Sequence, residues 1–130
     1  MFNLLIVGSR NFDDYDYLTK KLKVQFKIGK INKILSGGAI GVDSLAEQFA
    51  NEENVQFEKY IPNWSKYGKR AGIFRNQEMV NNCNFIVAIW DGISKGTNST
   101  IKFAQQKGID GLIINFLNDE VTNFNESLKF

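Results

Sequence analysis

The stretch that decides the fold is Ile34–Glu47, "ILSGGAIGVDSLAE", in which an apolar run ends at a serine and three glycines lead into an amphipathic segment. Glycine at the junction of a strand and a helix indicates a sharp turn or a close approach of the backbone to another group. The start of a helix also offers free N–H groups to an anion. The stretch matches neither GxxxxGK[ST] nor GxGxxG, so no generic nucleotide motif names what binds there.

The same alternation of strand and helix recurs along the whole chain. The apolar patterns predict strands at 3–7, 33–36, 55–61, 85–90 and 111–116, and helices at 13–28, 42–50, 68–82 and a segment that ends at Gln106. Parallel strands need crossover connections, so this order predicts an α/β, Rossmann-like, doubly wound sheet of about five parallel strands with helices on both faces.

One domain over residues 1–116 and a C-terminal tail over 117–130 are the expected organisation. In the tail, Val121, Phe124 and Leu128 share one face of a possible short helix, which would pack on the sheet or on another subunit. We therefore expect a homo-oligomer, a dimer or a larger assembly.

Composition removes several classes of chemistry. The 130 residues include no histidine, so histidine-based triads, HExxH zinc sites and histidine acid–base steps are excluded. A single cysteine, Cys83, excludes an internal disulfide and fits a reducing compartment. With no signal-peptide pattern and no apolar run long enough to span a bilayer, we expect a cytoplasmic protein without membrane contact. A net charge of +2 is too small to indicate a nucleic-acid partner by itself.

The unusual residues fall where three predicted strands end. Carboxyl ends of parallel strands meet at one rim, which is where ligands bind in open α/β sheets. Helix starts at Gly41 and Thr97 would add amide donors and partial positive charge, which suit a phosphate. The candidate ligand-binding residues are Gly8, Ser9, Arg10, Ser36, Gly37, Gly38, Ala39, Gly41, Asp43, Arg75, Asn76, Asp91, Gly92, Ser94, Gly96, Thr97, Ser99 and Thr100.

Each of these elements also has a purely structural explanation. Gly37, Gly38 and Gly41 serve a turn and close helix packing equally well. Asp43 in the first turn of a helix is favourable to the helix dipole without any ligand. What favours a site is the coincidence of three turns rich in Gly, Ser and Thr on one rim.

Four segments, in this order and spacing, carry a family resemblance: "GSRNFDD", "SGGAIGVDSLAEQFA", "NWSKYGKRAGIFRNQEM" and "WDGISKGTNSTIKFA". Together they resemble the YspA/cpYpsA-related branch of the SLOG superfamily, over nearly the whole chain. The superfamily includes Lonely Guy phosphoribohydrolases, molybdenum-cofactor carrier proteins and the Rossmann core of DprA. The resemblance implies a Rossmann-like fold and a nucleotide or nucleotide-derived ligand.

One departure bears on catalysis. The phosphoribohydrolases pair an arginine of an RKxxM-like motif with a glutamate of PGGxGTxxE. Here "RNQEM" keeps Arg75 and Met79, but "GTNST" places Thr100 where the glutamate would stand, and the PGG is missing. Binding is therefore favoured over hydrolysis, and no residue is assigned as catalytic. If the chain is an enzyme, an N-glycosidic hydrolase would rely on Arg75, Asp43 and Asp91.

Three functions remain open at this point. The first is a binding protein that senses, carries or sequesters a nucleotide-derived small molecule, related to ADP-ribose or a cyclic nucleotide signal. The second is a nucleotide-processing enzyme. The third and less favoured is single-stranded nucleic-acid binding, which needs a continuous basic groove with aromatic platforms. No cofactor and no metal are expected.

Overall fold

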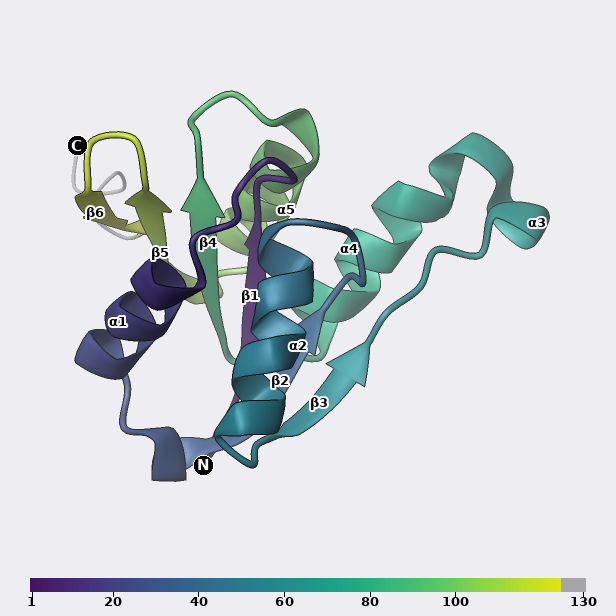
Figure 1. Ribbon diagram of the computed structural model, residues 1–130. Coiled ribbons are helices and arrows are strands. Elements are labelled where there is room, and N and C mark those ends of the chain that lie inside the picture. The colour runs from purple at the N-terminus through teal and green to yellow at the C-terminus, as the bar shows by residue number, and fades with distance from the viewer. Residues whose placement is uncertain (125–130) are drawn as a thin grey trace.

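The computed structural model describes residues 1–124, which form a single six-stranded sheet with helices on both faces (Figure 1). The elements in chain order are β1 (Phe2–Gly8), α1 (Tyr15–Gln25), η1 (Ile28–Lys30), β2 (Ile31–Ser36), α2 (Val42–Glu52), β3 (Gln56–Lys59), α3 (Trp64–Tyr67), η2 (Gly68–Arg70), α4 (Ala71–Asn81), β4 (Phe85–Trp90), α5 (Lys95–Gln106), β5 (Asp110–Asn115) and β6 (Glu120–Asn123). The predicted α/β, Rossmann-like class is confirmed.

The strand order is β3-β2-β1-β4-β5-β6, and the pairings among β1 to β5 are all parallel. The chain runs outward from β1 to β3 and then returns to place β4 against the other side of β1. Strand order therefore reverses between β1 and β4, where the loops at the carboxyl ends diverge to opposite faces and leave room for a ligand.

Two apolar layers hold the helices to the sheet. On one face, Leu18 and Leu22 of α1 and Phe49 of α2 are fully buried against the strands. On the other face, Met79 of α4 and Ile101 of α5 are buried in a separate cluster. Because β1 and β4 are covered on both faces, their apolar residues run continuously, as expected for central parallel strands.

The expectation of a short helix in the tail is wrong for the residues that the structure describes. Glu120–Asn123 instead form β6, which pairs antiparallel with β5 and places Val121 opposite Ile114. A turn at Asp119, whose φ is 62°, reverses the chain, and the buried Phe124 ring then packs on the sheet beside Gly111. Leu128 lies outside the described residues.

A helical arm, defined as residues 61–74, projects from the edge of the domain between β3 and the second half of α4 (Figure 1). Its exposed apolar side chains are Ile61, Trp64, Tyr67, Ile73 and Phe74. Trp64 and Tyr67 fall between the predicted strand at 55–61 and the predicted helix at 68–82, where no regular element is expected, whereas the structure has the short helix α3 with Asn63 as its N-cap. That the protein forms a homo-oligomer stays a prediction, and light scattering in solution tests it by measuring the molar mass.

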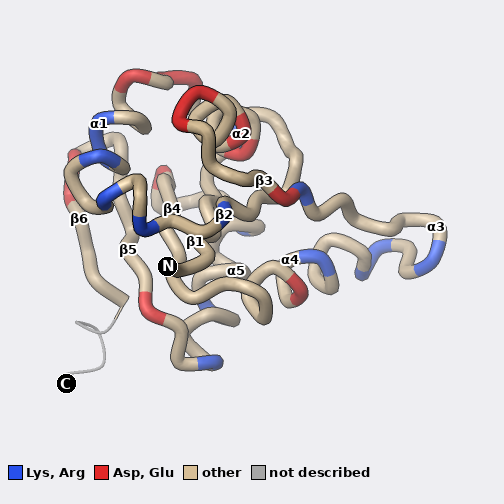
Figure 2. The backbone as a smooth tube through the Cα atoms, turned by 90° about the horizontal axis from the view of Figure 1, so that it is seen from below, with Lys and Arg blue, Asp and Glu red and all other residues tan. Residues whose placement is uncertain are grey.

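The arm differs in charge from the rest of the surface. Figure 2 shows Lys and Arg without Asp or Glu along the arm, whereas residues of both signs lie near α1 and α2 on the other side. Among residues 1–124, no helix has both the length and the apolar character needed to cross a bilayer.

Candidate functional site

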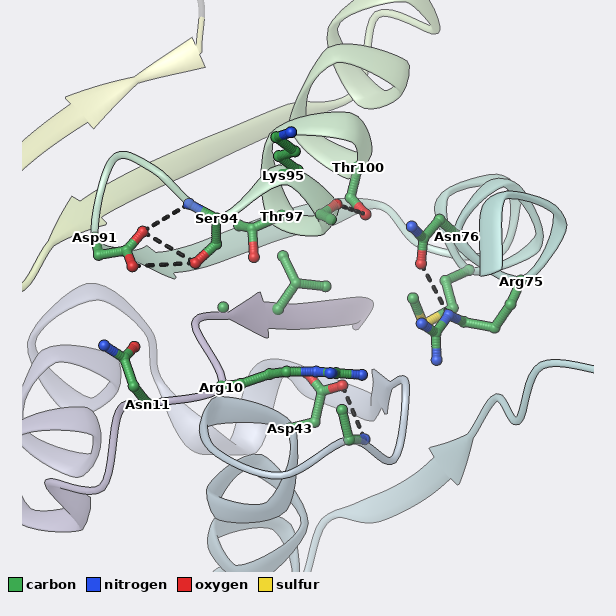
Figure 3. A pocket seen from close by; sticks show the side chains of 15 residues that line it. Arg10, Asn11, Asp43, Arg75, Asn76, Asp91, Ser94, Lys95, Thr97 and Thr100 are labelled. Carbon is green, nitrogen blue, oxygen red and sulfur yellow. Dashed lines mark hydrogen bonds between the residues drawn. The ribbon is translucent and has the colours of Figure 1, made fainter. Parts of the chain in front are cut away.

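A cavity of about 430 Å³ opens at the carboxyl ends of β1 and β4, where the strand order reverses (Figure 3). Its lining comes from the end of β1 and the loop after it, the β2–α2 loop with the first turn of α2, α4, and the β4–α5 loop with the first turns of α5. The lining residues are Val7, Gly8, Arg10, Asn11, Ala39, Asp43, Arg75, Asn76, Met79, Asp91, Ser94, Lys95, Gly96, Thr97 and Thr100.

Most of the residues that the sequence singled out line this cavity, but several do not. Ser36 is buried under it and donates a hydrogen bond from Oγ to the Ile6 carbonyl at 2.7 Å. Ser99 faces a neighbouring groove between α4 and α5. The other predicted residues outside the lining are Ser9, Gly37, Gly38, Gly41 and Gly92. Four lining residues were not among the candidates: Val7, Asn11, Met79 and Lys95.

The start of α5 presents its backbone amides to the cavity. The first N–H groups of a helix have no partner within it and are usually capped by a side chain. Ser94, the N-cap of α5, makes no such bond, because its Oγ contacts the Asp91 carboxylate at 3.0 and 3.1 Å and Ser9 Oγ at 3.3 Å. Gly96 and Thr97, in the first turn, both line the cavity. This helix start is suited to an anion.

The start of α2 is partly occupied by the protein's own groups. The Val42 N–H donates to the Ser9 carbonyl at 3.2 Å, and the carboxylate of Asp43 accepts a hydrogen bond from the Ala39 N–H at 3.1 Å. Gly41 has φ of 80°, and a Cβ there would lie 2.4 Å from the Ser9 carbonyl oxygen. Gly96 and Thr97 at the start of α5 line the cavity, whereas Gly41 and Val42 at the start of α2 do not.

Asp91 holds the loop between β4 and α5 in shape. Its carboxylate accepts hydrogen bonds from the N–H groups of Ile93 and Ser94, both at 2.9 Å, and its own N–H donates to Ser9 Oγ at 3.1 Å. Burial raises the pKa of Asp91, but the N–H groups of Ser94 and Ile93 and the Ser94 hydroxyl outweigh it, so its pKa lies below the ordinary value. The carboxylate is therefore ionised and already occupied by loop donors.

The pKa of Asp43 is shifted in the opposite direction to that of Asp91. Asp43 is buried, and this desolvation raises its pKa even though hydrogen bonds from Ala39 and Ser36 and the charge of Arg75 act against the rise. Among the carboxyl groups of the cavity, Asp43 is thus the one whose proton is held more tightly than usual. This property suits a general acid or a positioning group equally well.

Arg75 links α4 to the loop after β2. Its Nη1 donates to the carbonyls of Gly37 at 2.8 Å and Tyr60 at 3.3 Å, and its Nε donates to Asn76 Oδ1 at 2.8 Å. The pKa of Arg75 lies below its ordinary value. Burial and the charge of Arg10 lower this pKa by more than the charge of Asp43 raises it. Figure 3 shows Arg10 extending across the cavity toward Arg75, so two guanidinium groups converge on the same space.

Gly37 is required by this arrangement of side chains. A Cβ on Gly37 would lie 2.6 Å from Arg75 Nη1 and 2.9 Å from Asp43 Oδ2, distances that real Cβ contacts do not reach. The structural explanation of this glycine is therefore supported, although the groups it makes room for are themselves lining residues.

We expect Gly37→Ala to lower the free energy of unfolding by about 1–3 kcal/mol, because the added methyl group overpacks the space beside the Arg75 guanidinium and the Asp43 carboxylate. Urea denaturation of the purified variant measures the change. Gly29→Ala is the matched control, since a Cβ there meets nothing within 4 Å. Equal stability of the two variants would show that the Arg75 and Asp43 side chains rearrange without cost.

Among residues 1–124, no group of three or more His, Cys, Asp and Glu side chains is placed to hold a metal ion. The cavity's charges are instead three cations, Arg10, Arg75 and Lys95, and two carboxylates, Asp43 and Asp91. A small ligand that combines an anionic group with hydroxyl or amide donors suits this mixture.

The open parallel sheet, its reversal between β1 and β4 and the cavity at that point define a Rossmann-like α/β protein with a potential ligand site at the switch point. The chain belongs to the YspA, cpYpsA-related SLOG family, whose model matches residues 2–67. The family expected from the four sequence segments is confirmed.

Two proteins illustrate the likeness. The chain is 35% identical over 126 residues to the Gene 61 protein of Mycobacterium phage D29, an alignment that covers 89% of this chain and 97% of that protein. The structure of DNA processing protein A (DprA) from Streptococcus pneumoniae superposes with a TM-score of 0.67 at 18% identity. That match covers 85% of this chain and 49% of DprA, so the chain spans about half of the DprA structure, and the similarity shows the fold alone.

Proposed function

We propose that the protein binds a nucleotide or a nucleotide-derived small molecule in the cavity between β1 and β4, as a sensor, carrier or sequestering protein. The observation that carries the proposal is the uncapped start of α5, whose Gly96 and Thr97 line the cavity. A phosphate at this point would accept hydrogen bonds from backbone N–H groups and gain from the helix dipole.

The cations around the helix start support an anionic ligand. Arg10, Arg75 and Lys95 line the same cavity, and the charge of Arg10 adds to burial in lowering the pKa of Arg75. A phosphate between Arg10 and Arg75 would offset the repulsion of their charges and accept charge-assisted hydrogen bonds. Asn11 and Asn76 provide carboxamide groups that can donate to and accept from a ribose or a base.

Binding of AMP, ADP-ribose and cyclic AMP, measured by calorimetry, tests this function directly. We expect at least one of the three to bind with a stoichiometry near one per chain. A parallel native mass spectrum of the protein as purified identifies any nucleotide that is carried from the cell. Absence of binding by all three, together with an empty protein in the mass spectrum, would contradict the proposal.

Turnover is the alternative that Thr100 argues against. The Thr100 side chain is buried, and its hydroxyl donates to the Gly96 carbonyl of its own helix at 3.2 Å. A threonine in this position offers no carboxylate to a glycosidic bond. Asp43 is the remaining candidate acid, because its pKa is raised by burial and it lines the cavity.

We expect the wild-type protein to release no base from nucleoside monophosphates at an enzymatic rate. Chromatography of the products over several hours checks this, with wild type, Thr100→Glu and Asp43→Asn compared side by side. Weak activity gained only by Thr100→Glu would fit a binding protein that lacks one carboxylate. Turnover by wild type that disappears in Asp43→Asn would make the protein an enzyme with Asp43 as its acid.

A single-stranded nucleic acid is the second candidate ligand, and the helical arm favours it. Between Glu58 and Glu78 the chain carries cations but no Asp or Glu. In the arm, Lys66 Nζ lies 5.0 Å from the centre of the exposed Tyr67 ring, and Lys69 and Arg70 follow within the same short segment as Trp64 and Tyr67. Cations with aromatic rings are the usual elements of single-strand binding, which would show as strong salt dependence.

A further inference from the structure

A groove of about 340 Å³ lies between α4 and α5, beside the cavity already described. Asn76 and Lys95 line both the groove and the cavity, so the two adjoin at these residues. Figure 3 shows Asn76 on α4 and Lys95 on α5, the two helices that bound this side of the cavity. A ligand whose phosphate lies at the start of α5 can therefore extend between these two residues into the groove.

The groove has the chemistry that a nucleoside needs. Gln77 from α4 and Asn98 from α5 present carboxamides, which both donate and accept hydrogen bonds and so match the edges of nucleobases. Ile73 and Phe103 provide apolar surface from the two helices, on which the face of a base can pack.

The charge of the groove also selects the ligand. Its cations are Lys95 and Lys102, and no Asp or Glu is among its lining residues. The first cavity, in contrast, contains Asp43 and Asp91. The charged groups along the groove are therefore ammonium groups alone, which favours a second phosphate there over a cation.

We propose that the groove is a second subsite, which holds the second nucleoside of a dinucleotide whose first phosphate lies at the start of α5. This inference rests on the proposed function and narrows its ligand class. The ligand would consist of two nucleosides joined through phosphate, the first in the cavity and the second on the α4–α5 surface.

Three adenine nucleotides measured by calorimetry test the subsite. They are AMP, adenosine 3′,5′-bisphosphate (pAp) and the 5′-phosphorylated dinucleotide pApA. The bisphosphate controls for the extra charge, because it carries a second phosphate but no second nucleoside. We expect pApA to bind about 5- to 150-fold more tightly than pAp, the gain typical of one further stacked base.

Two variants test whether the higher affinity for pApA comes from the groove. Lys102→Glu reverses a charge in the groove, and Gln77→Leu removes a carboxamide with little change in size, while neither residue lines the first cavity. We expect both to erase most of the pApA advantage and to leave the AMP affinity unchanged. Lys30→Glu, which makes the same charge change in η1, is the control and should behave as wild type.

The possible outcomes distinguish failure of the second subsite from failure of the proposed function. Equal affinity for pAp and pApA, with AMP binding intact, would overturn the second subsite and leave the proposed function standing. Absence of binding by AMP, pAp and pApA would overturn the dinucleotide subsite, and the proposed function would fail with it if ADP-ribose and cyclic AMP also do not bind and the purified protein carries no nucleotide. A ten-nucleotide strand that binds far more tightly than pApA would overturn the dinucleotide-sized ligand and point to a nucleic acid on the same surface.

Discussion

Gly96→Glu is expected to abolish nucleotide binding while leaving the protein at least as stable as wild type. Gly96 lies in the first turn of α5 and lines the cavity, and a Cβ there meets nothing within 4 Å. A carboxylate at the start of a helix is favourable to the helix dipole, and replacing a helical glycine removes a cost of about 0.8–1.0 kcal/mol. The fold should therefore tolerate the change.

The same carboxylate opposes a bound phosphate. It places a negative charge where the phosphate would lie and competes for the backbone donors of Gly96 and Thr97. A like-charge contact costs several kcal/mol, so we expect the affinity for AMP or ADP-ribose to fall by about 100-fold or more. Calorimetry measures the loss, and thermal unfolding checks the fold.

Gly29→Glu is the matched control for this variant. Gly29 lies in η1, which precedes β2 at the opposite end of the sheet, and a Cβ there also meets nothing within 4 Å. It makes the same chemical change without approaching the cavity, so its affinity should equal that of wild type. Normal binding by Gly96→Glu would show that the ligand does not use the start of α5.

Arg75→Ala should weaken binding of the same nucleotide by about 10- to 150-fold, because a charge-assisted hydrogen bond contributes about 1.5–3 kcal/mol. The variant also loses the bonds from Nη1 to Gly37 and Tyr60, so its stability should fall as well. Affinities are therefore compared at a temperature where both proteins are folded.

Arg75→Lys separates the ligand contact from the structural one. A lysine keeps the charge but not the planar fork, so it should recover little affinity if the guanidinium binds the ligand with two donors. Arg70→Ala removes a neighbouring cation that does not line the cavity, and it should bind as wild type does. Unchanged affinity in Arg75→Ala would assign the arginine to the loop after β2 alone.

The sequence predicted the central fold well because its signals are local and repeated. Continuous apolar runs such as Phe85–Trp90 mark buried parallel strands, and this strand has the predicted bounds in the structure. The strand β6 was missed because Val121 and Phe124 also fit a helical face. The turn at Asp119 and the pairing with β5 favour a strand over a helix here, and a local sequence pattern reveals neither of them.

The site was predicted in outline because strand ends meet at one rim in any parallel sheet. Side-chain positions within it were harder. Met79 follows Arg75 by one helical turn, so helix periodicity offered a signal for its place in the cavity. Asn11 and Lys95 lie in a loop and at a helix start, where no periodicity indicates a direction. Gly41, in contrast, was a candidate but does not line the cavity. A glycine is needed there because the backbone passes close to the Ser9 carbonyl oxygen.

Amide chemical-shift mapping by NMR reports directly where on the protein a nucleotide binds. ADP-ribose is titrated into isotopically labelled protein, with AMP and cyclic AMP as parallel titrations. We expect the largest shifts on the amides of Gly96 and Thr97, with smaller ones at Gly8 and none at Gly29. Saturable shifts centred on η1 or on the arm, or no shifts with any of the three nucleotides, would contradict the proposed site at the start of α5.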